Sequence, residues 1–447
     1  MAIFSSLNRA QKEAVGLLQI GTFLEYFDLM LYVHMAVLLN ELFFPKTDPH
    51  TAALISAFAF CSTYVLRPFG ALLFGYIGDN IGRKTTVIIT TMMMSISCVI
   101  MANLPIYAQV GITATWVVTL CRIVQGLSSM GEIMGAQIYI AEITKPPVQY
   151  SVVSFVNVIA GVGSAAALGV AFLVTAVEFN WRIAFWIGGA VAVIGSVART
   201  RLRESPEFLQ GKKMRDKEIK EREASNQVPI SRTERIKSYF VNEKNARKDF
   251  ISYFLCYCGW PVSFYLCYMY FNPLLKSYGY TPEDIIYHNF LLSFFHVAFG
   301  VFYSLICFKF HPLKIVKNRL LIFMVFAAIL PLLIKSAQSP THVFCIQVVI
   351  LLLAIGEMPA AAVFIKHIHV LKRFTVTSFA YAASRALMYI FTSFGLVYFT
   401  ELFGPYGVWL ILIPVAMGVL YGVNHFEKLE RKSTENSYQS NTNLKAA

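Results

Sequence analysis

Long apolar stretches alternate with short polar segments along almost the whole chain. A helix rises about 1.5 Å per residue and a bilayer core is about 30 Å thick, so about 20 apolar residues can cross a membrane. Backbone polar groups have no water partner in lipid, so these spans must be helices. The pattern predicts an all-α membrane protein with twelve transmembrane helices, near residues 14–39, 51–77, 85–104, 112–141, 149–177, 182–199, 249–275, 282–309, 319–336, 341–367, 374–400 and 405–426.

One long polar segment divides the spans into two groups of six. We expect an N-terminal half at 1–199, a partly helical linker at 200–248, a C-terminal half at 249–426 and a short disordered tail at 427–447. The linker is rich in helix-forming residues, and the tail is polar. Two six-helix halves joined by a long loop are typical of transporters built from structural repeats, whose site lies near the membrane midplane.

The distribution of positive charge predicts the orientation. The chain is 57% hydrophobic and 14% charged, with a net charge of +13. Most charges lie in the short connections between spans, so the positive net charge does not indicate a nucleic-acid partner. Of the 38 lysines and arginines, 31 lie on the side of the N-terminus and three lie within the spans, whereas the other side holds only Lys46, Arg182, Lys276 and Lys335. The positive-inside rule therefore predicts that both termini are cytoplasmic.

Motifs for a cofactor, a metal or a catalytic centre are not found in the sequence. The eight cysteines lie within or beside apolar runs and lack the spacing of a metal site, so we interpret them as packing residues. There is no Walker motif, which argues against ATP as the energy source. No span carries a nucleophile elbow or a His–Glu metal motif, so we do not expect an enzyme.

The loop between the second and third spans carries the most informative motif. It reads Gly-Tyr-Ile-Gly-Asp-Asn-Ile-Gly-Arg-Lys and combines glycines, one carboxylate and a basic pair. This pattern resembles the loop motif of the major facilitator superfamily of secondary transporters. The motif residues are Gly75, Gly78, Asp79, Gly82, Arg83 and Lys84.

Further segments resemble the metabolite:proton symporter family, which includes proline/betaine, α-ketoglutarate and citrate carriers. They are Gly21–Asp28, Arg67–Ala71, Arg122–Leu127 with Gly131, Glu132, Ala141 and Glu142, Trp181–Phe185, and Arg203–Phe208. The chain departs from the family pattern at Met130 and Ala184, and its C-terminal half matches only weakly. The resemblance implies the major facilitator fold and proton-coupled transport.

Charged residues inside the spans are the candidate substrate and proton site, because a charge at mid-membrane is costly and usually has a partner. Glu25 and Asp28 share one face of the first span, and Arg122 lies at comparable depth in the fourth, with Glu132 farther inside. A nearby arginine favours the charged carboxylate, whereas burial favours the neutral one. The pair Asp28–Arg122 therefore either couples protonation to transport or only holds the helices together.

The second half offers its own candidates. Arg385 lies in the middle of the eleventh span, and Glu357 lies between a glycine and a proline where the tenth helix is expected to kink. We expect these two residues to pair. His296 is a weaker candidate for a proton site. Aromatic residues of the seventh span, such as Trp260, could provide a cation–π surface for a quaternary ammonium group.

The resemblance implies a second charged cluster on the cytoplasmic side. Glu142 is expected to join Asp79 and Arg83 in a network that locks the outward-facing state. The alternative is that Arg83 and Lys84 only fix the topology, but this would not explain Asp79 or the glycines. Arg67, in the second span, is interpreted as structural, either snorkelling or pairing with a carboxylate.

These observations favour a monomeric, proton-coupled symporter in the inner or plasma membrane, with the lipid bilayer, a small-molecule substrate and the proton as its partners. The substrate would be either a zwitterion of the proline or betaine type, or a di- or tricarboxylate. One cavity arginine with aromatic neighbours fits the first, and two arginines fit the second. A receptor-like sensor that does not transport is the alternative function.

Overall fold

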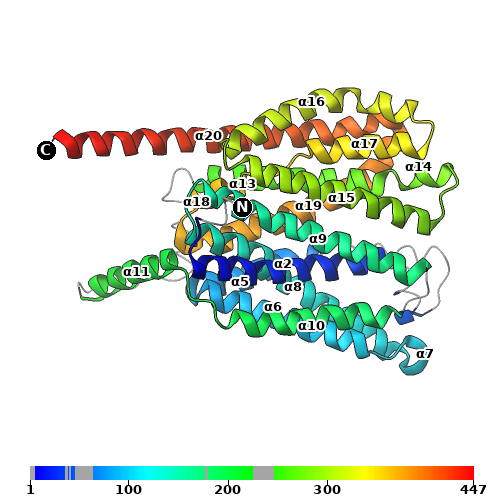
Figure 1. Cartoon of the computed structure of the whole chain (residues 1–447), viewed down its shortest axis with the longest axis horizontal. Helices are drawn as coiled ribbons and strands as arrows, with labels where there is room; N and C mark the ends of the chain where they lie inside the picture. Colours follow the sequence, from blue (N-terminus) through cyan, green and yellow to red (C-terminus); the bar gives the residue numbers. More distant parts are fainter. Residues whose placement is uncertain are drawn as a thin grey trace.

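The computed structural model describes residues 6–35, 39, 42–45, 64–176, 180–224 and 246–446. Within these residues every regular element is a helix (Figure 1). Seven stretches of the described chain are long and apolar enough to cross a membrane by length and composition, and one of them covers the last two spans. A described helix falls in each of the twelve predicted spans, in the second only from Tyr64 onward, which agrees with the expected fold class.

The first six spans form one half of the bundle. They are α2 (Arg9–His34), α5 (Arg67–Asn80), α6 (Arg83–Asn103), α8 (Ile112–Ile143), α9 (Val148–Ala176) and α10 (Trp181–Arg199). A short helix, α7 (Tyr107–Val110), precedes α8. The predicted span 51–77 is described only from Tyr64 onward, and its first part lies outside the described residues.

The last six spans form the other half, and two of them are irregular. They are α13 (Ala246–Tyr265), α15 (Pro282–Ile306), α16 (Pro312–Ser336), α17 (Pro340–Leu353) with α18 (Ala361–Lys366), α19 (Arg373–Phe403) and α20 (Trp409–Ala446). The seventh span continues from α13 through a π-helix (Leu266–Tyr270) into α14 (Asn272–Ser277). The tenth span is broken between α17 and α18, at the position where a kink was expected.

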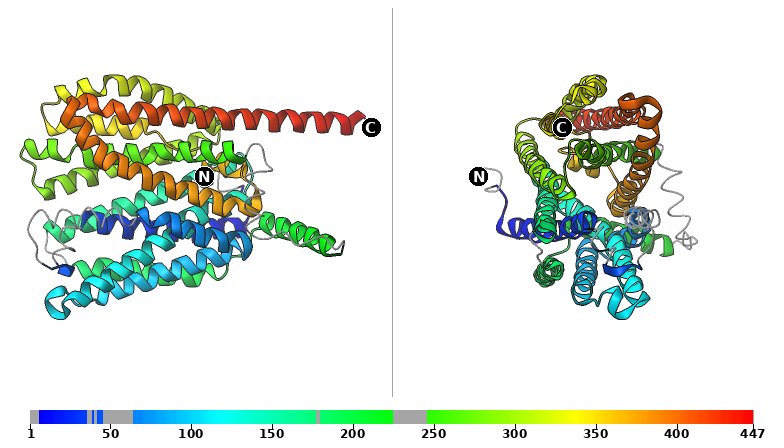
Figure 2. Two further views of the ribbon diagram at one scale, coloured as in Figure 1. Left: turned by 180° about the vertical axis from the view of Figure 1, so that it is seen from behind. Right: turned by 90° about the vertical axis from the view of Figure 1, so that its right-hand side faces the viewer.

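The two halves lie side by side and meet mainly through two helix pairs. The first half occupies the lower part of Figure 1 and the second half the upper part, and the reversed view in Figure 2 agrees. Helix α9 packs against α15, and α5 packs against α19. The linker helix α11 (Pro206–Ala224) protrudes from the end of the bundle where α2 begins and where α20 extends outward (Figure 1). We call this the α11 end.

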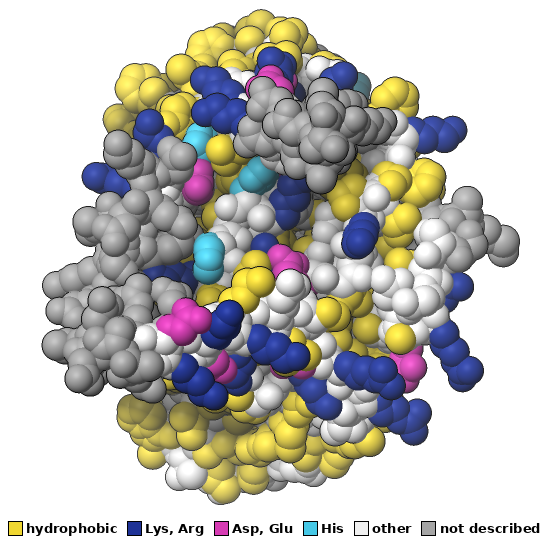
Figure 3. Space-filling model, turned by 90° about the vertical axis from the view of Figure 1, so that its left-hand side faces the viewer, with side chains coloured by type: hydrophobic (Ala, Val, Ile, Leu, Met, Phe, Trp, Pro, Cys, Tyr) yellow, Lys and Arg dark blue, Asp and Glu magenta, His cyan; other side chains and the backbone are white. Residues whose placement is uncertain are grey.

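The polarity of the surface differs between the α11 end and the flanks of the bundle. Figure 3 looks at the α11 end, where lysine and arginine side chains gather across the face, with apolar side chains around the rim. Large apolar side chains are exposed along the flanks of the helices, including Trp116, Val325 and Leu402. Such a large exposed apolar surface fits contact with lipid.

The prediction of a disordered tail at 427–447 is wrong. Helix α20 continues without a break to Ala446. Glu430 lies 2.7 Å from Lys366 Nζ and 2.6 Å from His367 Nε2, and Glu427 lies 2.7 Å from Lys317 Nζ. These ion pairs fasten the start of the tail to the ends of neighbouring helices, which a compositional argument cannot detect.

Candidate functional site

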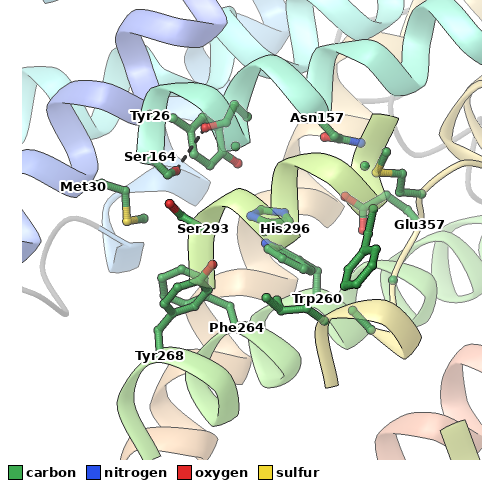
Figure 4. Close-up of a pocket in the computed structure, with 18 of the residues that line it drawn as sticks. Tyr26, Met30, Asn157, Ser164, Trp260, Phe264, Tyr268, Ser293, His296 and Glu357 are labelled. Atoms are coloured by element: carbon green, nitrogen blue, oxygen red, sulfur yellow. Dashed lines mark hydrogen bonds between the residues drawn. The ribbon is translucent and has the colours of Figure 1, made fainter. Parts of the chain in front are cut away.

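A cavity lies between the two halves, near the middle of the bundle (Figure 4). Helices α2, α5 and α9 of the first half line it, together with α13, α15, α16, α19 and the break between α17 and α18 from the second half. Its wall is rich in aromatic side chains, and its charged members are Arg67, Arg319, Glu357 and Arg385. The cavity can therefore hold a small molecule that carries both charged and apolar groups.

Arg67 enters the cavity wall from the first turn of α5. Its Nη2 atom lies 3.7 Å from Glu25 Oε1 on α2, and its guanidinium lies over the ring of Tyr64 at 5.0 Å. The guanidinium Nε has no hydrogen-bond partner among the described residues. The sequence interpretation allowed Arg67 to pair with a carboxylate, as it does with Glu25, but it missed the place of Arg67 in the cavity wall.

Arg385 enters the cavity from the opposite half. Its Nη2 atom lies 3.6 Å from Glu357 Oε1, so the structure brings together the two residues expected to pair. The guanidinium also lies 3.4 Å from the ring centroid of Tyr381. Glu357 belongs to the break between α17 and α18, where Gly356 and Met358 direct their carbonyls to Arg319 at 3.3 and 2.6 Å. The broken helix thus fixes one acidic and two basic side chains of the wall.

His296 and Trp260 form part of the aromatic wall. Their rings stack with centroids 4.8 Å apart, and both side chains face the cavity in Figure 4. Tyr268 and Phe264 continue this surface along α13 and the π-helix. Electron-rich ring faces of this kind attract organic cations.

The expected pair of Asp28 and Arg122 is present, but neither residue lines the cavity. Arg122 Nη1 lies 3.2 Å from Asp28 Oδ2, Gln125 Nε2 donates to Asp28 Oδ1 at 3.0 Å, and Cys98 Sγ lies 3.6 Å from Oδ1. The carboxylate of Asp28 is thus held by side chains of α6 and α8. This arrangement ties three helices of the first half together.

Glu132 is also separate from the cavity lining. Its Oε2 lies 2.6 Å from Arg199 Nη1, and its Oε1 accepts hydrogen bonds from Thr90 at 3.0 Å and Thr91 at 2.6 Å. Arg199 additionally donates to the carbonyl of Leu18 at 2.9 Å. Sequence reasoning assigned no partner to Glu132, although Arg199 at the end of the sixth span is a candidate that could have been considered.

Between the cavity and the α11 end, the two halves touch. The hydroxyls of Tyr26 on α2 and Tyr381 on α19 are 3.0 Å apart. A second contact lies at the first turn of α19. There, Asp79 of α5 accepts hydrogen bonds from the backbone N–H groups of Phe374 at 3.0 Å and Thr375 at 2.8 Å. A carboxylate at this place caps the positive end of the helix dipole of α19.

A charged network, which we call the α11-end network, surrounds this cap. It consists of Asp79, Arg83, Glu142, Glu207 and Arg373. Arg83 lies 3.0 Å from Asp79 and 3.2 Å from Glu142, and Arg373 of the second half lies 3.1 Å from Glu142 and 3.0 Å from Glu207. The expected cluster of Asp79, Arg83 and Glu142 is therefore assembled. The sequence missed Arg373 and Glu207, which reach it from α19 and α11.

The glycines of the loop motif allow this close approach. A methyl group added at Gly75 would lie 2.7 Å from Thr375 Cα, and one added at Gly78 would lie 2.5 Å from Phe374 Cδ2. A group added at Gly82 would meet the carboxylate of Glu204, which accepts the backbone N–H groups of Arg83 at 3.0 Å and Lys84 at 3.3 Å. These glycines leave room for α19 and for the segment that precedes α11.

Comparison with known proteins identifies the family. The model of the Major Facilitator Superfamily matches residues 18–385. The chain belongs to this superfamily. Its helical halves, central cavity and loop motif are therefore those of a major facilitator protein, and the resemblance found in the sequence is confirmed.

Relatives of this major facilitator protein are transport proteins. It is 32% identical over 206 residues to the proline/betaine transporter of Salmonella typhimurium, covering 44% of this chain and 41% of that protein. It is 36% identical over 213 residues to the inner membrane metabolite transport protein YhjE of Escherichia coli, covering 46% and 48%. The match thus spans about half the length of these relatives. The family and these relatives agree with the expectation that the chain is not an enzyme.

A solved structure agrees in fold. The proton:xylose symporter XylE superposes with a TM-score of 0.75 over 93% of this chain and 95% of that one, at 16% sequence identity. At this identity the likeness concerns the fold alone. It supports two six-helix halves around a central cavity.

Proposed function

We propose that this protein is a secondary active transporter that carries a small metabolite together with a proton by alternating access. The observation that carries the proposal is the central cavity. It holds Arg67 from one half and Arg385 from the other, and contacts between the halves separate it from the α11 end. A site between two halves that close on one side is what alternating access requires.

The α11-end network supplies the conformational part of the proposal. Asp79 binds the start of α19, and Glu142 binds Arg373, so each contact joins the first half to the second. Opening the α11 end requires these contacts to separate. The positive-inside rule supports the proposal that this end, and both termini, face the cytoplasm of a cell with the protein in its inner or plasma membrane.

The cavity supports a substrate that carries a carboxylate. A guanidinium is the preferred partner of a carboxylate because it donates two parallel hydrogen bonds. The aromatic wall around Trp260 favours a zwitterion with an organic cation, whereas the two arginines Arg67 and Arg385 favour a di- or tricarboxylate. The printed name of the Salmonella relative supports the first class.

Buried acidic residues near the arginines support coupling to protons. Of the six candidate residues taken from the sequence, Glu357 and Arg385 line the cavity and Glu25 lies against Arg67 of its wall, whereas Asp28, Arg122 and Glu132 form pairs that hold helices of the first half together. XylE is described as a proton:xylose symporter, which supports the same energy source for this fold. The cavity is built within one chain, which supports function as a monomer.

Counterflow distinguishes a transporter from a receptor-like sensor of the same fold. Proteoliposomes are loaded with unlabelled proline, glycine betaine, α-ketoglutarate or citrate and then diluted into the labelled compound. A transporter exchanges label into the vesicles for at least one member of this panel. Binding of a panel member to the purified protein without any exchange would support the sensor and overturn the proposal.

A further inference from the structure

Two acidic residues lie one turn apart on α2, but their surroundings differ. Asp28 accepts from Gln125 at 3.0 Å and pairs with Arg122 at 3.2 Å, with Cys98 also in contact. Neither carboxylate oxygen of Glu25 has a side-chain hydrogen-bond partner among the described residues, the backbone of Ile133 is a weak donor at most, and the side chain is only 1% exposed. Asp28 is therefore supported as an anion, whereas Glu25 is not.

Glu25 depends on a single close cation. A buried carboxylate without hydrogen bonds is costly in its ionised form and much less so when it is protonated. Arg67 is the nearest basic group, and its Nη2 atom lies 3.7 Å from Glu25 Oε1, beyond hydrogen-bonding distance. The charge on Glu25 is therefore stabilised mainly by the position and availability of Arg67.

The other charged groups that act on Glu25 already have partners. Glu132 of α8 is paired with Arg199 of α10 at 2.6 Å, and Arg385 of α19 is paired with Glu357 at 3.6 Å. The remaining titratable neighbours are Tyr26 and Tyr381, whose hydroxyls contact each other. Glu132 and the two tyrosines carry no positive charge, and Arg385 cannot replace Arg67 as the close counter-charge of Glu25 without giving up Glu357.

Arg67 is the residue of this pair that the substrate can reach. It lines the cavity, while Glu25 lies behind it and is not part of the lining. The Nε of Arg67 is buried and has no hydrogen-bond partner among the described residues, so it has a donor available for an anionic ligand. A carboxylate that binds this guanidinium would compete directly with Glu25 for it.

We propose that Glu25, rather than Asp28, takes up the transported proton when the carboxylate of the substrate binds Arg67. The inference rests on the proposed transport function. Before binding, the arginine balances the charge of Glu25; after binding, it balances the substrate. One proton then passes from water in the cavity to an oxygen of Glu25, and no other bond forms or breaks. Substrate and proton therefore bind together.

Glu357 is in a different position, although it also lies close to an arginine. It lines the cavity, where water or substrate can reach its carboxylate. Unlike the oxygens of Glu25, those of Glu357 are not among the buried polar atoms that lack a hydrogen-bond partner in the described part of the chain. This contrast selects Glu25 among the acidic residues of the two cavity pairs.

The test measures proton uptake on substrate binding, using full-length protein in detergent with little buffer and a pH-sensitive dye. Each of proline, glycine betaine, α-ketoglutarate and citrate is added to wild type, Glu25→Gln and the matched variant Asp28→Asn. Wild type should take up a proton with the compound that it binds, and binding should tighten as the pH falls. Glu25→Gln should bind the same compound without proton uptake and without this pH dependence.

Infrared difference spectra of the folded protein provide a second readout, which depends neither on transport nor on how much of a variant folds. Substrate should produce a protonated-carboxyl band in wild type that is missing in folded Glu25→Gln. Proton uptake and the band should persist in Asp28→Asn. Proton uptake by folded Glu25→Gln would overturn the inference while leaving the proposed function intact. If no panel compound binds or exchanges in wild type, the proposed function fails and the inference fails with it.

Discussion

The carboxylate of Asp79 on α5 accepts the backbone N–H of Thr375 on α19 at 2.8 Å. A side chain of the first half thereby caps a helix of the second half. The same carboxylate holds Arg83 at 3.0 Å, which in turn contacts Glu142. Because the cap exists only while the halves are together, its free energy contributes directly to the difference between the closed and open states of the α11 end.

Asp79→Asn should open the α11 end more often. The amide keeps only one acceptor oxygen and loses the charge, and a hydrogen bond to a charged group contributes about 1.5–3 kcal/mol. We expect a shift of about tenfold or more toward the open state. Ser378→Cys, in a background without other cysteines, reports this shift, because Ser378 is fully buried on α19 between Thr375 and Tyr381. A membrane-impermeant thiol reagent applied from the α11 side measures its reactivity.

Asp216→Asn is the matched control, since Asp216 lies on α11 and pairs only loosely with Arg215, at 3.5 Å. It should leave the labelling rate of Ser378→Cys unchanged. If Asp79→Asn labels at the same rate as this control, the cap does not stabilise the closed state.

Gly75→Ala should loosen the same closure without removing any charge. The added methyl group would lie 2.7 Å from Thr375 Cα, so α5 and α19 must move apart. Overpacking of this kind costs about 1–3 kcal/mol. The labelling of Ser378→Cys should therefore rise as it does in Asp79→Asn. Gly16→Ala is the control, because a methyl group at Gly16 on α2 meets nothing within 4 Å. Equal labelling in both alanine variants would mean that close packing at Gly75 is not needed for closure.

Sequence reasoning succeeded where the signal is local. Apolar length predicts each span, and the depth of Asp28 and Arg122 along their spans predicts their pairing. The glycine and proline that flank Glu357 predict the irregular tenth span, which the structure shows as a break between α17 and α18. These features follow from hydrophobicity and backbone chemistry within one segment.

Features that depend on contact between distant segments could not be predicted in the same way. Arg67 was interpreted as structural because the sequence does not tell which face of α5 meets the cavity. Arg373 and Glu207 join the α11-end network only because α19 and α11 converge there. Glu430 fastens the tail through residues more than 60 positions away, so the polar composition of the tail was misleading.

Glu132→Gln should destabilise the fold. Glu132 forms a buried ion pair with Arg199 at 2.6 Å, and its loss leaves the arginine without its counter-charge. Breaking a buried pair in this way costs about 3–5 kcal/mol. Thermal unfolding in detergent should show a clear decrease in Tm, while the affinity of the remaining folded protein for its substrate stays the same, since Glu132 does not line the cavity.

Glu221→Gln is the comparison, because Glu221 forms an exposed pair with Lys217 at 3.7 Å and such pairs contribute little. Its Tm should match that of the wild type. A Glu132→Gln protein with unchanged Tm and weakened substrate binding would instead place Glu132 in the substrate site.

Uptake driven by an imposed proton gradient tests the central claim most directly. Proteoliposomes containing the wild-type protein receive an inward proton gradient and the panel compound that shows counterflow. We predict accumulation above the external concentration, and its loss when a protonophore collapses the gradient at constant substrate concentration. Accumulation that continues undiminished after the collapse would contradict proton symport and would point to another coupling ion or to exchange.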